Sequence, residues 1–222
     1  MIIVIDGPAG SGKSSTAKAV ADKLDIQYLD SGALYRTLTL IYLESGKDKT
    51  KFFELLNQKS ISFYYTDGAF NVSIGKQNIT DHLRTVEVSE HVSTVAAMLK
   101  SREHVNRLMR KAVQQGAWIA EGRDLGTAVF PDAELKFFMV ADLDTRAERR
   151  YKELKAKGTD ITKDEVKKRI LERDRKDSQR KSDPLRKADD AIKVDTSEMT
   201  FEQQVNFICS KITDKFQRLL KY

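Results

Sequence analysis

The sequence is poor in cysteine: Cys209 stands alone, so no disulfide can form within the chain. A single cysteine among apolar neighbours is usually a packing residue, and such scarcity points by default to the reducing cytoplasm. No apolar run approaches the roughly 20 residues that cross a bilayer, so we expect no membrane segment. The chain opens on a short apolar run rather than a basic and then apolar leader, so we also expect no targeting peptide.

Histidine is also scarce, and the spacing of His82, His91 and His104 does not match a set of metal ligands. We assign these three residues no role beyond surface or packing. Internal repeats and low-complexity stretches are absent from the sequence. With 222 residues, 40% of them hydrophobic and 32% charged, the chain suits a soluble globular protein, either one large α/β domain or a core with a small insertion.

The charge is unevenly distributed. A net charge of +6 and an isoelectric point of about 9.2 would suit a nucleic-acid-binding protein. Residues 146–181, however, hold 15 Lys and Arg against 8 Asp and Glu, which exceeds the surplus of the whole chain. Acidic residues recur within this segment, unlike in a plain basic arm. We therefore expect the segment to cover the phosphates of a nucleotide, and we expect no nucleic-acid partner.

The strongest motif, GPAGSGKS at residues 7–14, matches the phosphate-binding pattern G-x-x-x-x-G-K-[ST]. An apolar run at 2–5 precedes it and helical spacing follows it, which is the strand–loop–helix context that the motif requires. Glycines let backbone N–H groups converge on phosphate oxygens, and the helix N-terminus adds positive charge. Lys13 would reach the β- and γ-phosphates, and the Ser14 hydroxyl would ligate Mg²⁺. The predicted triphosphate-binding residues are Gly7, Pro8, Ala9, Gly10, Ser11, Gly12, Lys13, Ser14 and Ser15.

Two further charged motifs directly follow predicted strands. Asp30 and Ser31 lie in DSGALYR, where the start of a helix would hold an anion, and Arg36 lies more than one turn into that helix. Taken alone, Arg36 would be a solvated helix arginine. Arg123 and Asp124 lie in EGRDLGT, where a guanidinium suits phosphate and a carboxylate accepts from an amine or hydroxyl. The alternative is a structural ion pair that pins the loop.

The fourth motif, ERDRKDSQR, places Arg173, Asp177 and Arg180 at positions i, i+4 and i+7 of a predicted helix, and therefore on one face. Such a pattern is often an ordinary surface ion-pair ladder. Its functional alternative is a face that presents two guanidiniums and a carboxylate to a phosphate and a ribose.

The remaining pattern predicts a mainly parallel sheet covered by helices on both faces, because strands and helices alternate over most of the length. We predict strands at 2–6, 26–30, 117–121, 135–140 and 190–195, and helices at 13–24, 32–44, 101–115, 144–157, 163–181 and 200–220. Two β-rich runs, at 61–65 and 70–74, flank Asp67-Gly68 and predict a hairpin, with a possible third strand at 77–80. This antiparallel element is either decoration or part of a second substrate site.

Together, these motifs resemble those of the bacterial cytidylate kinases, a family of nucleoside monophosphate kinases. The matching stretches span residues 5–197 and read IDGPAGSGKSS, YLDSGALYR, VSTVAA with the arginine of SREHV, EGRDLGTAVFPDAELKFF, RRYKEL, RDRKDSQR, PLRKADDAI and VDTS. The resemblance implies the P-loop NTPase fold, with a five-stranded parallel sheet flanked by helices. It further implies a core kinase domain at 1–45 and 93–222, a small antiparallel β-containing monophosphate-binding insertion at 46–92, and a helical lid at 151–181.

The family pattern also implies roles for individual residues. Lys13, Arg36, Arg123 and Arg180 would be catalytic, with the three arginines holding the acceptor's phosphate and the transferring phosphoryl group. Ser93, Arg102 and Asp124 would recognise the cytosine ring, Arg173 and Asp177 would reach the sugar, and Ser31 would lie at the acceptor site. Glu121 stands where relatives carry Asp, and we interpret it as an acceptor for Mg²⁺-bound water.

The implied reaction is ATP-dependent phosphorylation of CMP, and of dCMP, with Mg²⁺ held by Ser14 partly through water. A carboxylate at Asp124 would accept from the cytosine amine and repel the uracil carbonyl, which favours CMP over UMP. We expect a cytoplasmic monomer whose partners are ATP and CMP or dCMP. Two alternatives remain: a kinase for another monophosphate such as UMP or dTMP, and a phosphate-loop regulator or RNA-binding protein.

Overall fold

The computed structural model describes residues 1–156 and 158–219. Every predicted strand and helix is present within a few residues of its expected bounds, and the predicted helix ends at 157 and 220 lie outside the described residues. The elements are β1 (Ile2–Asp6), α1 (Lys13–Leu24), β2 (Gln27–Asp30), α2 (Ser31–Glu44), α3 (Lys49–Gln58), β3 (Ile61–Thr66), β4 (Ala69–Ile74), β5 (Gln77–Asn78), the 3-10 turn η1 (Thr80–Arg84), α4 (Val86–Ala96), α5 (Leu99–Ala112), β6 (Trp118–Gly122), the π-helical turn η2 (Leu125–Val129), β7 (Leu135–Val140), α6 (Leu143–Ala156), α7 (Lys163–Gln179), β8 (Ile192–Asp195) and α8 (Phe201–Leu219).

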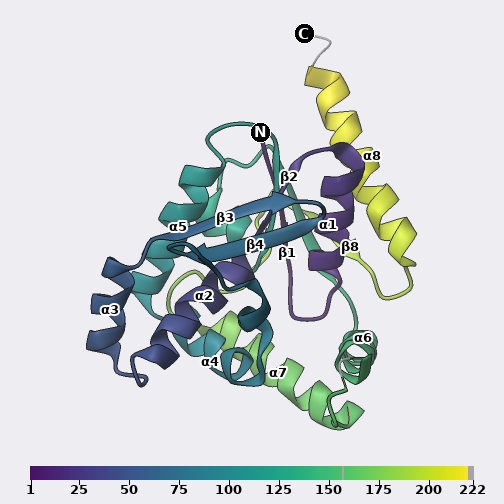
Figure 1. The fold of residues 1–222 in the computed structure, drawn as a ribbon. Coiled ribbons are helices and arrows are strands. Elements are labelled where there is room, and N and C mark those ends of the chain that lie inside the picture. Colours follow the sequence, from purple (N-terminus) through teal and green to yellow (C-terminus); the bar gives the residue numbers. More distant parts are fainter. Residues whose placement is uncertain (157, 220–222) are drawn as a thin grey trace.

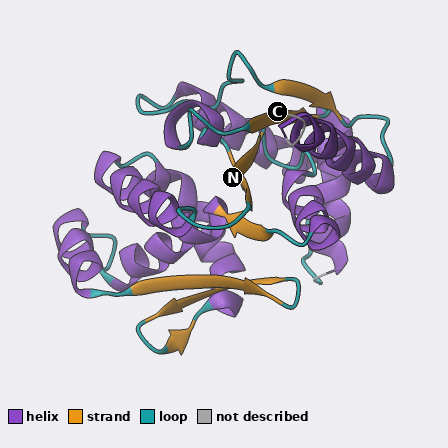
Figure 2. Ribbon diagram, turned by 90° about the horizontal axis from the view of Figure 1, so that it is seen from above, coloured by secondary structure: helices purple, strands orange, loops and turns teal. Residues whose placement is uncertain are grey.

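The main sheet has five parallel strands in the order β2-β6-β1-β7-β8. Its central strand, β1, is fully buried from Ile3 to Ile5, because helices cover both faces (Figure 2). The glycine loop joins β1 to α1 at the carboxyl edge of the sheet, above α6 and α7 in Figure 1. This is the arrangement of the P-loop NTPase fold that the family resemblance implies.

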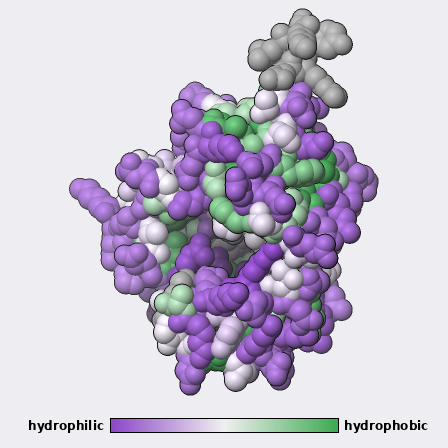
Figure 3. All heavy atoms as spheres, turned by 90° about the vertical axis from the view of Figure 1, so that its right-hand side faces the viewer, coloured by the Kyte–Doolittle hydropathy of each residue, from purple (hydrophilic) through white to green (hydrophobic). Residues whose placement is uncertain are grey.

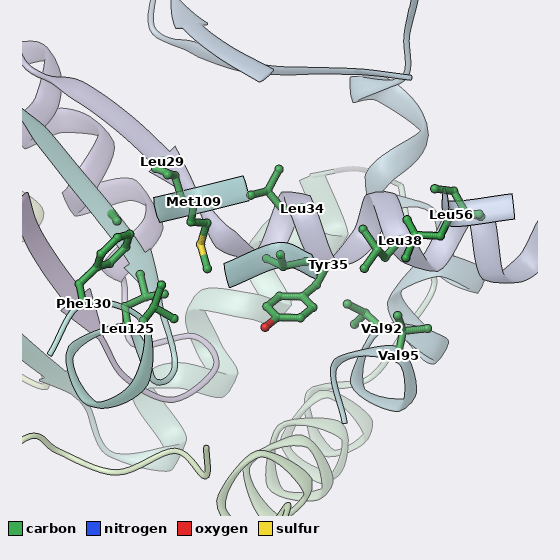
Figure 4. Packing of buried hydrophobic residues seen from close by; sticks show 14 of the residues in the cluster. Leu29, Leu34, Tyr35, Leu38, Leu56, Val92, Val95, Met109, Leu125 and Phe130 are labelled. Carbon is green, nitrogen blue, oxygen red and sulfur yellow. The ribbon is translucent and has the colours of Figure 1, made fainter. Parts of the chain in front are cut away.

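Alternate residues of β1 serve two hydrophobic clusters, as the period of a strand requires. Val4 joins the cluster formed with α2 and α5, and Ile5 joins the one formed with α1 and α8. Tyr35 reaches from α2 into the first cluster, between Leu125 on one side and Val92 on the other (Figure 4). Helix α2 therefore packs against the core, while its first residues lie at the edge of the sheet that holds the phosphate loop.

The segment predicted as an insertion, residues 46–92, contains the predicted hairpin. Strands β3 and β4 pair antiparallel, and β5 adds a short third strand. Asp67 and Gly68 have φ values of 50° and 65°, the left-handed conformation that a two-residue hairpin turn needs. The sheet packs on α2 through a small cluster that includes Val72, Leu83 and Ala33.

Two helices in this region were not predicted. Helix α3 is short, and α4 is rich in β-branched residues that favour strands. The tertiary context makes α4 a helix: Thr85 caps its first turn, and Val88, Val92 and Val95 form one buried face. The boundary predicted between residues 92 and 93 falls inside α4.

The segment predicted as a lid includes the end of α6 and all of α7. Residue 157 of this segment lies outside the described residues, as do residues 220–222 of the predicted core. Helix α7 begins with the predicted capping box, in which Thr162 and Glu165 satisfy each other's backbone N–H groups.

In the described part of the chain, no helix is long and apolar enough to cross a membrane.

Candidate active site

The glycine loop is held in a conformation that only glycine permits. Gly12, just before α1, has φ 90°, and a Cβ on Gly7 would lie 2.1 Å from the carbonyl oxygen of Met139. The Lys13 ammonium folds back over the loop and donates to the carbonyl of Pro8 at 3.1 Å. Burial, with the nearby charge of Arg123, lowers the pKa of Lys13 to about 7. A phosphate in this loop would restore the charge of the lysine.

Ser14 and Glu121 form the candidate magnesium site. Ser14 Oγ donates to Glu121 Oε1 at 2.7 Å, so the first turn of α1 is joined to the end of β6. Burial, with the charge of Asp30 on the neighbouring strand, raises the pKa of the Glu121 carboxyl. A hydroxyl and a carboxylate beside a phosphate loop are the hard oxygen donors that Mg²⁺ prefers, so these residues fit the ion.

Two arginines of the site, Arg123 and Arg173, flank the carboxylate of Asp177, and a third, Arg36, lies within reach of their charges. Arg123 Nε donates to Asp177 Oδ2 at 3.0 Å, and Arg173 Nε lies 4.0 Å from the same oxygen. Burial, with the charges of Arg123 and Arg36, lowers the pKa of Arg173 to about 9, which places the three guanidiniums within each other's field. The Nε atoms of Arg36 and Arg173 are buried, and neither finds a hydrogen-bond partner among the residues that the structure describes.

Such a concentration of buried positive charge calls for an anion. Lys13 adds a fourth cation, since Arg123 and Arg173 both act on its pKa. Unpaired guanidinium N–H groups are costly when buried and favourable when they meet phosphate oxygens. On the face seen from the right of Figure 1, a recess with a hydrophilic lining is visible near the middle of the molecule (Figure 3). The cluster Lys13, Arg36, Arg123 and Arg173 is suited to hold more than one phosphate.

A second cluster combines Arg102, Asp124 and Arg180. Arg102 Nη2 and Arg180 Nη2 both donate to Asp124, the latter at 2.6 Å. Arg102 and Asp124 are almost completely buried, which is tolerated because opposite charges are paired. Arg180 thus contacts Asp124, one of the predicted base-recognition residues. Ser93 lies half-buried on α4, and within the described ranges its side chain makes no hydrogen bond to Arg102 or Asp124.

The start of α2 lies between the loop and the insertion. Ser31 Oγ donates to the Glu121 carbonyl at 2.7 Å, and Asp30 caps the helix by accepting from the Ala33 N–H at 2.9 Å. The other Asp30 oxygen accepts from Arg84 Nη2 of η1 at 3.1 Å. A cavity of about 260 Å³ lies at this junction; its lining includes Ser14, Asp30, Phe70 and Arg84. Arg84 was not predicted, because its neighbours in the sequence form no recognisable motif.

Four other contacts at the loop were also missed. Asp6 accepts from the N–H groups of Leu125 and Gly126, at 3.0 and 2.7 Å, and burial raises its pKa to about 7. Arg146 of α6 donates to the Ala9 carbonyl and to Asp174 of α7. In the sequence, the only indications of these contacts are the position of Asp6 at the end of a predicted strand and the presence of Asp174 in the motif ERDRKDSQR.

Comparison with known proteins identifies the family. Residues 3–214 match the cytidylate kinase family. A cytidylate kinase of Lactococcus lactis subsp. cremoris is 45% identical over 210 residues, covering 94% of this chain and 96% of its own length. One from Streptococcus thermophilus is 46% identical over 220 residues, covering 96% and 97%. A solved structure of an uncharacterized protein from Eubacterium ventriosum covers 96% of this chain and 98% of its own at a TM-score of 0.50 and 14% identity, and supports the fold alone. The match over nearly the whole chain shows that it belongs to the cytidylate kinase family.

Proposed function

We propose that this protein transfers the γ-phosphoryl group of ATP to CMP, giving ADP and CDP, and that it accepts dCMP in the same way. The observation that carries the proposal is that a cluster of basic side chains at the phosphate loop lies next to the Arg102–Asp124 cluster. The phosphate loop and the cations Lys13, Arg36, Arg123 and Arg173 suit two sets of phosphates. The Arg102–Asp124 pair beside them offers both donors and an acceptor to a pyrimidine.

In the proposed reaction, a phosphate oxygen of CMP attacks the γ-phosphorus of ATP, and the bond to the bridging oxygen of ADP breaks. The attacking oxygen is already anionic, so no general base is needed. The protein must bring two repelling anions together and stabilise the charge of the transition state. We assign this work to the loop N–H groups, Lys13, Arg36, Arg123 and Arg180, the last of which also contacts Asp124. Ser14, with Glu121 behind it, would hold Mg²⁺, which neutralises phosphate charge when bound.

For the acceptor, we propose that Asp124 accepts from the cytosine amine while Arg102 donates to the ring acceptors, with Ser93 and Arg180 completing the site. Uracil presents a carbonyl where cytosine has the amine, so Asp124 disfavours it. Arg173 and Asp177 are proposed to contact the sugar, and Ser31 to lie beside the acceptor phosphate. Arg173 also belongs to the phosphate cluster, because the charges of Arg123 and Arg36 act on it most strongly.

Two segments are proposed to close over these ligands. Residues 46–92 would form the monophosphate-binding insertion, which the Arg84–Asp30 ion pair connects to the start of α2. Residues 151–181 would form the lid, and Asp174 of α7 already meets the loop N–H of Ala9 at 3.2 Å. Closure of such segments excludes water and limits wasteful ATP hydrolysis.

The proposal is tested by ATP consumption in a coupled assay with CMP, dCMP, UMP, dTMP and AMP, with and without Mg²⁺. We expect Mg²⁺-dependent turnover with CMP and dCMP and much lower kcat/KM with the others. A preference for UMP or dTMP would assign another acceptor to the same site, and salt-sensitive RNA binding without CMP-dependent turnover would overturn the kinase proposal. We also propose a monomer in the cytoplasm, which size-exclusion chromatography with light scattering and cell fractionation can check.

A further inference from the structure

Asp183, in the connection between α7 and β8, holds two arginines that the proposed function assigns to the acceptor. Its Oδ2 accepts from Arg102 Nε at 2.8 Å, and its carbonyl oxygen accepts from Arg180 Nε at 2.6 Å. The same two arginines donate through Nη2 to Asp124. The result is a closed network in which two guanidiniums are shared between two aspartates.

This network uses the donors that a ligand would need. The Nε atom of a guanidinium carries a single hydrogen, and Asp183 takes that hydrogen from both Arg102 and Arg180. Arg102 Nη1 reaches the Ala96 carbonyl at 3.4 Å, so each nitrogen of this buried side chain has a protein partner. Among the described residues, one hydrogen on each Nη atom stays free, but Nε has only the one that Asp183 accepts, so a pyrimidine that accepts from Arg102 Nε must displace Asp183.

Of the two aspartates, Asp183 is the one that can leave. Its side chain is 35% exposed, against 5% for Asp124, so its carboxylate can return to water at small cost. Asp124 follows a central strand, whereas Asp183 lies outside any helix or strand. Its backbone is also strained: φ is 47°, a value uncommon for a residue with a side chain, and Pro184 follows it. The contacts with the two arginines stabilise that conformation.

We propose that Asp183 is an affinity-determining residue that competes with the acceptor nucleotide for Arg102 and Arg180. An acceptor that takes the Nε hydrogen of Arg102 must first release the Asp183 carboxylate, and that release loosens the loop whose carbonyl holds Arg180, so this contact weakens acceptor binding. The inference rests on the proposed function, because it takes the acceptor site from there.

The test is the Asp183→Asn variant, which removes the charge and keeps a residue type that tolerates positive φ. We expect the KM for CMP, and the Kd for CMP measured by calorimetry, to fall about three- to tenfold, because the fraction of molecules with a free site rises. Asp183→Gly, which removes the carboxylate and relieves the strain, should lower both values at least as far. The KM for ATP should stay within about twofold.

The matched control is Asp25→Asn. Asp25 is an exposed aspartate with φ 52° at the end of α1, away from these arginines, and its substitution should leave every constant unchanged. Unchanged or raised KM for CMP in both folded Asp183 variants overturns the inference, since a residue that positions Arg102 would raise it. Thermal unfolding of each variant shows that it is folded. If the unsubstituted protein does not phosphorylate CMP, the proposed function fails instead, so the two failures are distinguishable.

Discussion

Ser14 Oγ lies 2.7 Å from Glu121 Oε1 and donates a hydrogen bond to it. The serine comes from the phosphate loop, and the glutamate from the end of a strand more than a hundred residues later. Because parallel strands end at one edge of the sheet, the pairing of β1 with β6 in register brings the two side chains together. The contact gives a physical basis for the interpretation of Glu121 as a magnesium-site residue.

The Glu121→Gln variant tests this interpretation. Gln keeps the size and can accept from Ser14, but it removes the negative charge. We expect the Mg²⁺ concentration for half-maximal activity to rise by about tenfold, as for the loss of other outer-sphere metal partners. Glu121→Asp keeps the charge and should lose less. A titration with unchanged Mg²⁺ dependence in the Gln variant would remove Glu121 from the metal site.

Lys13 should take up a proton when ATP binds. Its pKa is lowered to about 7 from an ordinary value of 10.5, so most Lys13 side chains are neutral at pH 8. Triphosphate oxygens favour the ammonium form and raise the pKa, so protons are absorbed on binding between about pH 7 and 10. Calorimetry of ATP binding in buffers of different ionisation enthalpy measures the uptake. The Lys13→Ala variant should show no such proton uptake, and its turnover should fall by orders of magnitude. Equal proton uptake in that variant would show that Lys13 is not the group that takes up the proton.

Asp124→Asn should weaken the choice between CMP and UMP. The amide can donate to the uracil carbonyl that a carboxylate repels, so we expect the kcat/KM ratio of CMP over UMP to fall by about tenfold or more. Asn is the better variant because Ala would leave two arginines facing an unfilled space, at a cost of about 3–5 kcal/mol in folding free energy. An unchanged ratio in a folded Asn variant would show that Asp124 does not recognise the base.

Asp174→Asn tests the contact between α7 and the phosphate loop. Asp174 accepts from Ala9 N–H at 3.2 Å and pairs with Arg146, which also holds the Ala9 carbonyl. Without that charge the loop loses a restraint, so we expect the KM for ATP to rise about three- to tenfold while the KM for CMP changes little. The control is Glu172→Gln, on an exposed position of the same helix. Equal effects on both substrates would point to a general loss of stability.

Much of the fold could be predicted because it depends on local patterns. The buried β1 run, the glycines of the loop and the Asp67-Gly68 turn each specify their backbone within a few residues. Helix α4 could not be predicted, since its β-branched residues favour a strand until α2 covers their buried face. The site was harder still. Motifs identified Arg102, Asp124 and Arg180 as candidates, but nothing in their spacing connects them with Asp183.

By itself, the sequence determined the strands, the helices outside residues 46–98, the phosphate loop and the family. These depend on periodicity, on residues that permit particular backbone angles, and on contiguous motifs. Only the tertiary structure decided which charges meet. It brought Glu121 within hydrogen-bond distance of Ser14, Arg123 and Arg173 to the same carboxylate of Asp177, and Asp183 to Arg102, a residue 81 positions earlier. Ion pairs between distant segments depend on how the sheet and its helices pack, and that packing is a property of the whole chain.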